Sequence, residues 1–336
     1  MNLKLKFKHK IIAITTFAGL LPIIVVLILT RLMGSNVTGE VNEKFQEQTL
    51  INISQIAKDV YNLCEMSNNL LIESVQHNLN VARKEIKEKG GVKLSLENVT
   101  WQAVNQFSLK TKEVSLPKFL IGSQWLKQNK DFKTETFVVD DVIKLVGGTI
   151  TIFQRINAEG DMLRVATNVK KLDGSRAIGT YIPAVNPDGK SNPVVSKVIN
   201  GETYIGRAFV VNAWYITVYE PIKDPNGNII GMLYAGIQQD AVASITNSIK
   251  NVSVGATGKV TVFGGRGDDF GKILINNDDN SLGSSIFDLQ NDETKIWLKD
   301  NFNKAINAGK GGVITGVNQW KEALDTEAKP RLTAIT

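Results

Sequence analysis

The side chains best suited to chemistry are arginines and aromatic rings that gather between residues 147 and 239. Arginine pairs with a carboxylate through two parallel hydrogen bonds, and aromatic rings form the apolar walls of pockets. The combination favours a small carboxylate ligand over a sugar or a cation. The expected ligand-binding residues are Arg155, Asn168, Arg176, Tyr181, Arg207, Trp214 and Tyr219, and the same arginine and aromatic set includes Arg164 and Tyr204.

Each of these residues also has a plainer interpretation. An arginine on a strand can lie on a solvated face, and Trp214 and Tyr219 can pack in the core, because large aromatic side chains are highly buried on average. Side chains alternate between the two faces of a strand, which places Trp214 and Tyr219 on opposite faces. Both can line one site only where a bulge intervenes.

Metal-binding patterns are weak. The chain has two histidines, His9 and His77, and a single cysteine, Cys64. No zinc spacing and no intrachain disulfide follow from these residues. The acidic pairs Asp268-Asp269 and Asp278-Asp279 lack the spacing of a calcium loop and are typical of solvated turns. We expect no metal and no cofactor.

Catalytic patterns are equally weak. The segment Gly264–Lys272 is similar to a phosphate-binding loop, but that loop requires glycine where this chain has Arg266, and serine or threonine where it has Ile273. A glycine-rich hairpin is the better interpretation. No serine stands in a nucleophile elbow, and histidine is nearly absent. We therefore expect a protein that is not an enzyme.

Composition limits the class of protein. The 336 residues allow roughly two domains. Hydrophobic residues make up 43% of the chain, which is typical of a folded protein. The net charge of +6 is modest, and the basic residues are scattered apart from those in the first ten positions. Nucleic-acid binding is not expected, because it would require a basic face or a known module.

The N-terminus carries the pattern of a membrane anchor. Lys4, Lys6, Lys8 and Lys10 precede Ile11–Leu29, a run without a charged residue. About 20 apolar residues cross a bilayer as a helix, and the basic flank belongs in the cytoplasm. We predict a cytoplasmic tail at residues 1–10 and a transmembrane helix at 11–33, with the remainder outside. A cleavable signal peptide is the alternative, although its apolar region usually has about 7–15 residues followed by small residues.

A long helix should follow at residues 34–91. Apolar residues recur every three or four positions, glycine and proline are absent between Gly39 and Lys89, and Gly90-Gly91 ends the pattern. Fifty or so residues extend roughly 80 Å as a helix. Such a helix would form a spine and the seam of a homodimer. Two ordinary helices with a break at Asn68-Asn69 are the alternative.

Alternating apolar residues predict a five-stranded antiparallel sheet after this helix. Its strands are expected at Thr149–Ile156, Met162–Val169, Tyr204–Val211, Trp214–Ile222 and Ile229–Ile237. Residues 92–146 are less clear. They contain a strand-like run at Val114–Ile121, which Pro117 interrupts, and a short helix at Val139–Val146.

An internal repeat divides the remainder into two modules, 92–239 and 240–336, which a helix at Asp240–Lys250 joins. The matching segments are Ile150–Phe153 with Val260–Phe263, Thr167-Asn168 with Asn276-Asn277, Lys197–Gly201 with Lys304–Gly309, and Val211–Trp214 with Val317–Trp320. The second copy has no counterpart of Ile229–Ile237. An unpaired last strand would leave an open sheet edge, so we expect this module to be incomplete.

Several segments resemble the tandem Cache sensor region, of the Cache 3/Cache 2 fusion type, of bacterial methyl-accepting chemotaxis proteins. They are GGTITIFQR at 147–155, RVATN at 164–168, DGSRAIGTYIP at 173–183, NPVV at 192–195 and GETYIGRAFVVNAWY at 201–215. The resemblance covers roughly residues 35 to 336. It implies an α+β fold, with a long transmembrane and spine helix followed by two PAS-like modules with antiparallel sheets. Ligand would bind in the membrane-distal module, here 92–239.

The resemblance implies a function in chemotaxis. We expect the extracytoplasmic ligand-sensing region of a transmembrane chemoreceptor in the inner (plasma) membrane, with a single N-terminal anchor. Its partners would be a small-molecule ligand, the membrane, a second copy through the spine helix, and a cytoplasmic kinase and adaptor through a C-terminal region that the sequence lacks. Two alternatives remain open: the input region of a sensor histidine kinase or diguanylate cyclase, and a membrane-anchored extracellular hydrolase.

Overall fold

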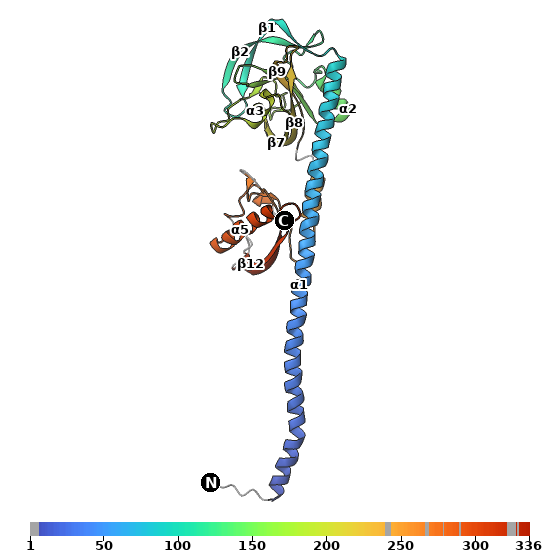
Figure 1. Cartoon of the computed structure of the whole chain (residues 1–336), viewed down its shortest axis with the longest axis vertical. Helices are drawn as coiled ribbons and strands as arrows, with labels where there is room; N and C mark the ends of the chain where they lie inside the picture. The colour runs from blue at the N-terminus through green and yellow to red at the C-terminus, as the bar shows by residue number, and fades with distance from the viewer. Residues whose placement is uncertain are drawn as a thin grey trace. The chain divides into compact units, whose positions relative to one another are not determined.

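The fold is taken from a computed structural model that describes residues 7–238, 243–265, 269–277, 279–288, 290–320, 327 and 329–336. Its first element is the 82-residue helix α1, Phe7–Glu88 (Figure 1). The helix runs through Asn68-Asn69, so the alternative of two helices with a break there is wrong. It ends at Glu88, just before Gly90 and Gly91, which both have positive φ, and the Gly91 amide donates to the Ile86 carbonyl at 2.9 Å.

The predicted anchor at residues 11–33 lies within α1. Over the ranges that the structure describes, no helix is both long enough and apolar enough to cross a bilayer. The structure therefore does not confirm the anchor.

The chain divides into two compact units. One is Leu63–Ser248, and the other combines Met1–Asn62 with Ile249–Thr336. The first unit includes the C-terminal part of α1 as well as the sheet that follows it. The predicted first module, 92–239, is thus the larger part of a unit that begins inside the helix.

The sheet of the first unit has nine strands in the order β3-β2-β1-β6-β5-β4-β9-β8-β7 (Figure 1). The strands are β1 Val92–Asn105, β2 Thr111–Ile121, β3 Gln124–Trp125, β4 Thr149–Arg155, β5 Met162–Thr167, β6 Thr180–Ile182, β7 Tyr204–Val210, β8 Ala213–Lys223 and β9 Ile229–Gln238. The five predicted strands are present as β4, β5, β7, β8 and β9, and adjacent ones pair antiparallel. The predicted helix is α2, Val139–Val146.

The prediction of a five-stranded, purely antiparallel sheet is wrong. The structure adds β1, β2, β3 and β6, and β1 pairs parallel with β6. A register shift between Leu94 and Asn98 interrupts the alternation along β1. Pro117 does not end β2, because it lies opposite Asn98, at the edge of this irregularity, where a missing amide is tolerated.

Two cores cover the two faces of this sheet. On one face, α1 contributes Val75, Leu79 and Ala82, which share a buried cluster with Ile150 and Ile152 of β4. The opposite face is covered by helix α3, Pro193–Ile199, and by the connection between β5 and α3. Its buried cluster contains Phe153, Met162, Tyr215, Tyr219, Met232 and Tyr234 from the strands, and Val194, Val195 and Val198 from α3.

Helix α4, Ala243–Lys250, crosses from the first unit into the second at Ser248. After it, the described residues of the second unit form β10 Val262–Phe263, β11 Ile273–Ile275, the short 3-10 helix Asp279–Ser281, α5 Asp292–Ala308, β12 Ile314–Trp320 and β13 Lys329–Ile335. β10 pairs with β11, and β12 with β13. Ile273, Ile286, Phe287, Leu298 and Phe302 form the core.

The segments of the internal repeat in the sequence have similar secondary structure in some places and different secondary structure in others. Lys304–Asn307 lies in the last turns of α5, and Lys197–Ile199 forms the last residues of α3. Val317–Trp320 lies inside β12, whereas Val211–Trp214 contains the turn between β7 and β8. The first residues of the predicted helix at Asp240, and Arg266, Asp268 and Asp278 of the motifs considered above, fall outside the described residues.

Candidate functional site

The most unusual side chain of the first unit is Arg164, in the middle of β5. It is 0% exposed, in a strand whose six residues are all buried. Met162 and Arg164 lie on the face away from α1, and Leu163 lies on the face that packs against α1. A bulge in the pairing of β4 with β5 places Arg164 opposite Phe153. The guanidinium carbon lies 5.0 Å from the centroid of the Phe153 ring.

Neutral groups hold the guanidinium of Arg164. Its Nη1 donates to Thr180 Oγ1 at 2.8 Å, and its Nη2 donates to Gln106 Oε1 at 3.0 Å. Its Nε is buried and has no hydrogen-bond partner. No carboxylate in the described part of the chain forms an ion pair with it. Burial lowers the pKa of Arg164, and interactions with Tyr219, Tyr234 and Tyr215 oppose that shift.

Such an arrangement is costly. A buried charge normally has a partner of opposite sign, and a buried N–H normally has an acceptor. Removing one member of a buried ion pair lowers the free energy of unfolding by several kcal/mol, because the other charge is left buried without a partner. Among the described residues, Arg164 lacks both a counter-ion and an acceptor for Nε, and an anion is the kind of group that supplies both.

Tyrosines surround this arginine on the same face. Tyr219 of β8 and Tyr234 of β9 are direct partners across the two strands, and their ring centroids are 4.8 Å apart. The Phe153 ring lies 6.2 Å from Tyr219 and 6.5 Å from Tyr234. Burial raises the pKa of both tyrosines, so their hydroxyls stay neutral at physiological pH. We call Arg164, Phe153, Tyr219 and Tyr234 the arginine–tyrosine cluster.

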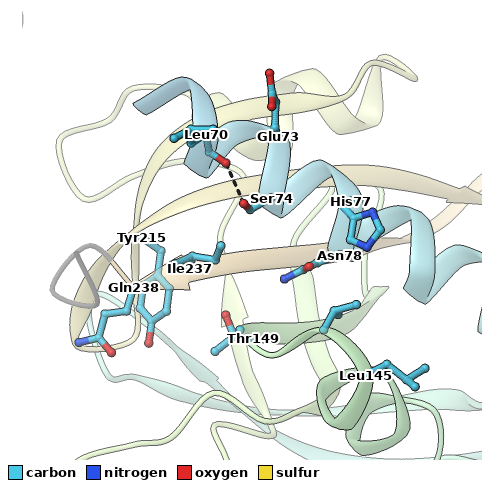
Figure 2. A pocket seen from close by; sticks show the side chains of 12 residues that line it. Leu70, Glu73, Ser74, His77, Asn78, Leu145, Thr149, Tyr215, Ile237 and Gln238 are labelled. Carbon is cyan, nitrogen blue, oxygen red and sulfur yellow. Dashed lines mark hydrogen bonds between the residues drawn. The ribbon is translucent and has the colours of Figure 1, made fainter. Parts of the chain in front are cut away.

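A cleft of about 830 Å³ opens at the ends of β4, β8 and β9 (Figure 2), and no member of the arginine–tyrosine cluster is among the residues that line it. Its walls are Leu70, Glu73, Ser74, His77 and Asn78 of α1, Leu145 and Val146 of α2, and Gly148, Thr149, Tyr215, Ile237 and Gln238. Thr149 Oγ1 lies 3.0 Å from the hydroxyl of Tyr234, which joins the wall of the cleft to the cluster. The volume falls within the range of about 300–1,000 Å³ for ligand pockets.

Arg176, a predicted ligand-binding residue, has a different environment from Arg164. It is 1% exposed, and its guanidinium makes a bidentate pair with Asp140, at 2.9 and 2.7 Å. It also donates to the carbonyls of Asp131, Thr134 and Thr167, and it lies 4.3 Å from the Phe132 ring centroid. Its charge is already neutralised, and it ties the loop before α2 to the sheet.

Arg155 and Asn168 serve the backbone of the hairpin that contains them. Arg155 donates to the carbonyls of Asn157 and Ala158 in the turn between β4 and β5. Asn168 accepts from the amide of Ile150 at 2.8 Å and donates to the carbonyl of Gly148 at 3.0 Å. These two hydrogen bonds join GGT at 147–149 to TN at 167–168, at the start of β4.

The other predicted residues lie in three separate places. Tyr181 is buried in β6, where its hydroxyl accepts from Asn105 Nδ2 at 3.3 Å and Lys112 lies over its ring. Arg207 stacks on Trp214 at 4.0 Å, and Trp214 is 42% exposed. Trp214 and Tyr219 lie on opposite faces, as alternation predicts. Of the seven predicted residues, the arginine–tyrosine cluster contains Tyr219 alone.

The predicted site list lacks Arg164, Phe153 and Tyr234, which the structure places together with Tyr219. One signal in the sequence was available. Met162-Leu-Arg-Val-Ala166 is apolar except for its central arginine, and a charge in a strand buried on both faces requires an explanation. Gln106 and Thr180, the acceptors for Arg164, have no such signal.

The chain was also compared with known proteins. The family model described as Cache 3/Cache 2 fusion domain matches residues 38–332. No curated protein matches. Similar solved structures include the periplasmic sensory domain of the Campylobacter jejuni chemoreceptor Tlp1, with 12% identity over 86% of this chain and 95% of that one, and a TM-score of 0.39.

Two further structures illustrate the range of matches. The sensory domain of C. jejuni Tlp3 with isoleucine bound has 12% identity over 81% of this chain and 84% of that one, and a TM-score of 0.37. The Escherichia coli DcuS sensor domain has 19% identity over 33% of this chain and 70% of that one, and a TM-score of 0.22.

Proposed function

Because the chain belongs to the Cache 3/Cache 2 fusion domain family, we propose that it is the extracytoplasmic sensor of a bacterial chemoreceptor and binds a small carboxylate at Arg164. Cache domains are ligand-binding sensors rather than enzymes. The proposal assigns no catalytic role to any residue. A cytoplasmic kinase and adaptor would receive the signal through the receptor's output region.

One observation carries the choice of ligand: Arg164 is a fully buried cation without a counter-ion among the described residues, and its Nε has no acceptor. A carboxylate supplies both missing elements, since it accepts paired hydrogen bonds from a guanidinium. Binding would therefore relieve a cost that the free protein carries. A sugar would leave the charge unpaired, and a cation would add to it.

The remaining groups of the arginine–tyrosine cluster have roles in this proposal. The neutral hydroxyls of Tyr219 and Tyr234 can donate to a second carboxylate oxygen or accept from a polar ligand group. Phe153 and Met232 supply apolar surface. The cleft beside Thr149 and Tyr215 would be the access route to the buried arginine.

The same strands give a route for a signal. α1 packs on one face of β4, β8 and β9, and the cluster lies on the other. At the start of β4, the carbonyl of Gly147 lies 3.5 Å from Asn78 Nδ2 of α1. We propose that ligand binding shifts these strands against α1. This requires two states with different affinities for the ligand.

Membrane attachment and pairing remain parts of the proposal that rest on α1. The lysine-flanked run Ile11–Leu29 supports an anchor, which reporter fusions and carbonate extraction would test. Recovery of a soluble protein cut near residue 34 would refute it.

Exposed apolar side chains on α1, among them Val41, Phe45, Met66 and Leu70, support a homodimer along the helix. Light scattering of the full chain would measure it.

Calorimetric titration of the full chain with short organic acids tests the site. We expect a carboxylate to bind to the wild type and Arg164→Met to weaken binding by at least 10- to 100-fold, since a charge-assisted hydrogen bond contributes about 1.5–3 kcal/mol. Arg155→Met is the matched control, because Arg155 contacts only its own turn among the described bonds. Equal weakening by both variants would refute the assignment of Arg164.

A further inference from the structure

The arginine–tyrosine cluster also restricts what else the ligand can carry. Building on the proposed function, we infer that the ligand is a short carboxylic acid without an ammonium group, such as a 2-hydroxy acid, and is not an amino acid. The argument depends on where the acidic side chains around the cluster point. An ammonium group in a buried site needs acceptors and a negative charge to replace its water.

The acidic residue nearest to Arg164 in the sequence, Asp161, already has partners outside the cluster. Asp161, just before β5, accepts from Lys112 Nζ at 2.8 Å, from Asn157 Nδ2 at 2.9 Å and from the Ala184 amide at 2.9 Å. Its carboxylate therefore already has three donors at the β4–β5 turn. It cannot serve a ligand ammonium without giving up the bonds that close this turn.

Two other acidic residues that could meet a ligand ammonium, Glu220 and Asp140, already form ion pairs with arginines. Glu220 follows Tyr219 on β8, but alternation directs it to the opposite face, where it pairs with Arg83 of α1. Asp140 is the bidentate partner of Arg176. Glu73 of α1 lines the cleft and is not part of the arginine–tyrosine cluster. Among the described residues, no hydrogen bond or ion pair joins a carboxylate side chain to Arg164, Tyr219 or Tyr234.

The aromatic rings do not replace a carboxylate. Rings can hold an ammonium by cation–π attraction. However, one face of Phe153 is already occupied by the guanidinium of Arg164 at 5.0 Å, and Tyr219 and Tyr234 pack against each other. Their raised pKa values keep the hydroxyls neutral. An ammonium would thus become a second cation beside Arg164.

The polar groups that remain are neutral and suit a hydroxyl substituent. Gln106 Oε1 and Thr180 Oγ1 accept from the guanidinium, and Thr180 Oγ1 donates to the Ala177 carbonyl at 2.8 Å. A ligand hydroxyl can donate to either oxygen without adding a charge. A monocarboxylate also balances the single positive charge of Arg164. A zwitterion would bring one negative and one positive charge and would leave the site with the net charge it had before.

Matched pairs of acids test this inference on the full chain. Lactate is compared with alanine, and 2-hydroxy-3-methylbutanoate with valine, by calorimetric titration of wild type and Arg164→Met. Each pair shares a carbon skeleton and differs in the 2-substituent. We expect the hydroxy acid of at least one pair to bind at least 10-fold more tightly than the amino acid, and Arg164→Met to abolish the binding.

A second variant keeps the arginine and replaces its neutral partner. Gln106→Glu is nearly isosteric and places a carboxylate where Gln106 Oε1 now accepts from Arg164 Nη2 at 3.0 Å. This built-in anion should compete with the ligand. We expect it to weaken hydroxy-acid binding at least 10-fold, whereas Gln106→Met, which adds no charge, should weaken it less.

The outcomes separate this inference from the function on which it rests. Amino acids that bind as tightly as their hydroxy partners, and lose affinity in Arg164→Met, would overturn the inference and leave the carboxylate site in place. Binding of any of these acids that Arg164→Met and Gln106→Glu leave unchanged would overturn the proposed site itself, and so would the failure of all four acids and of the wider organic-acid panel to bind.

Discussion

Removing one or the other of the two buried arginines should have different effects on the stability of the ligand-free protein. Arg164 and Arg176 are both almost completely buried, yet only Arg176 has a carboxylate partner among the described residues. The perturbation is substitution by methionine, which keeps the length of the side chain and removes the charge. The readout is the melting temperature of the full chain without added ligand.

Arg176→Met leaves Asp140 partly buried without its bidentate partner. Breaking a buried ion pair by removing one member costs about 3–5 kcal/mol. For a unit of the size of Leu63–Ser248, a change of 1 kcal/mol moves the melting temperature by about 2–4 °C. We therefore expect the transition of this unit to fall by about 6–20 °C.

Arg164→Met removes a charge that has no counter-ion. It loses the hydrogen bonds to Gln106 and Thr180 and the contact with Phe153, and it gains apolar packing in a buried strand. Replacing a buried ion by a well-packed apolar residue is often neutral or stabilising. We expect a melting temperature equal to or above that of the wild type.

Added ligand should stabilise the wild type but not Arg164→Met. A ligand at 100 times its dissociation constant stabilises the native state by about 2.7 kcal/mol, which is about 5–11 °C here. The wild type should show this shift, and Arg164→Met should not. A fall of 6–20 °C for Arg164→Met without ligand, similar to that of Arg176→Met, would show that Arg164 is a structural residue and would refute the reasoning.

Three further predictions concern pH and backbone geometry. A hydrogen bond from Lys89 lowers the pKa of Asp141. The contribution of this carboxylate to stability is therefore present above its unfolded pKa of about 3.9 and lost as pH falls through its folded pKa. Thermal melting of the wild type and of Asp141→Asn should show a flatter fall in melting temperature between pH 5 and 3 for the variant. Burial raises the pKa of Tyr219 and Tyr234, so calorimetry should find ligand affinity constant between about pH 6 and 9; a loss of affinity toward pH 9 would contradict neutral tyrosines. Gly148 has φ +72°, and an added Cβ would lie 3.0 Å from the Gly236 carbonyl oxygen of β9. Gly148→Ala should therefore lower the free energy of unfolding, measured by chemical denaturation, by about 1–3 kcal/mol. An unchanged denaturation midpoint would contradict the close approach of Gly148 to β9.

Local patterns were sufficient for most elements of the first unit. The alternation in Thr149–Ile156 and in Ile229–Ile237 predicts β4 and β9, and the apolar spacing and polar ends of Val139–Val146 predict α2. These signals depend on neighbours a few residues apart, which the sequence displays directly. The same holds for the end of α1 just before Gly90-Gly91.

The missing strands have a physical cause. The irregularity between Leu94 and Asn98 shifts the alternation of β1 in the middle of the strand, and Pro117 lies opposite it in β2. Each feature alone argues against a strand, and only their pairing makes both acceptable. The parallel contact of Val104 with Thr180 joins segments far apart in the sequence, and nothing local to either one indicates it.

The candidate site shows the same limit more sharply. Arg164 and Arg176 stand 12 positions apart in segments that resemble the same family, and residue type alone cannot separate them. Their roles differ because of what lies opposite. Asp140, 36 residues before Arg176, neutralises that arginine, whereas Arg164 faces Gln106, Thr180 and three tyrosines. The proposed binding arginine thus differs from the structural one by its missing partner, and a missing partner is a property of the folded chain.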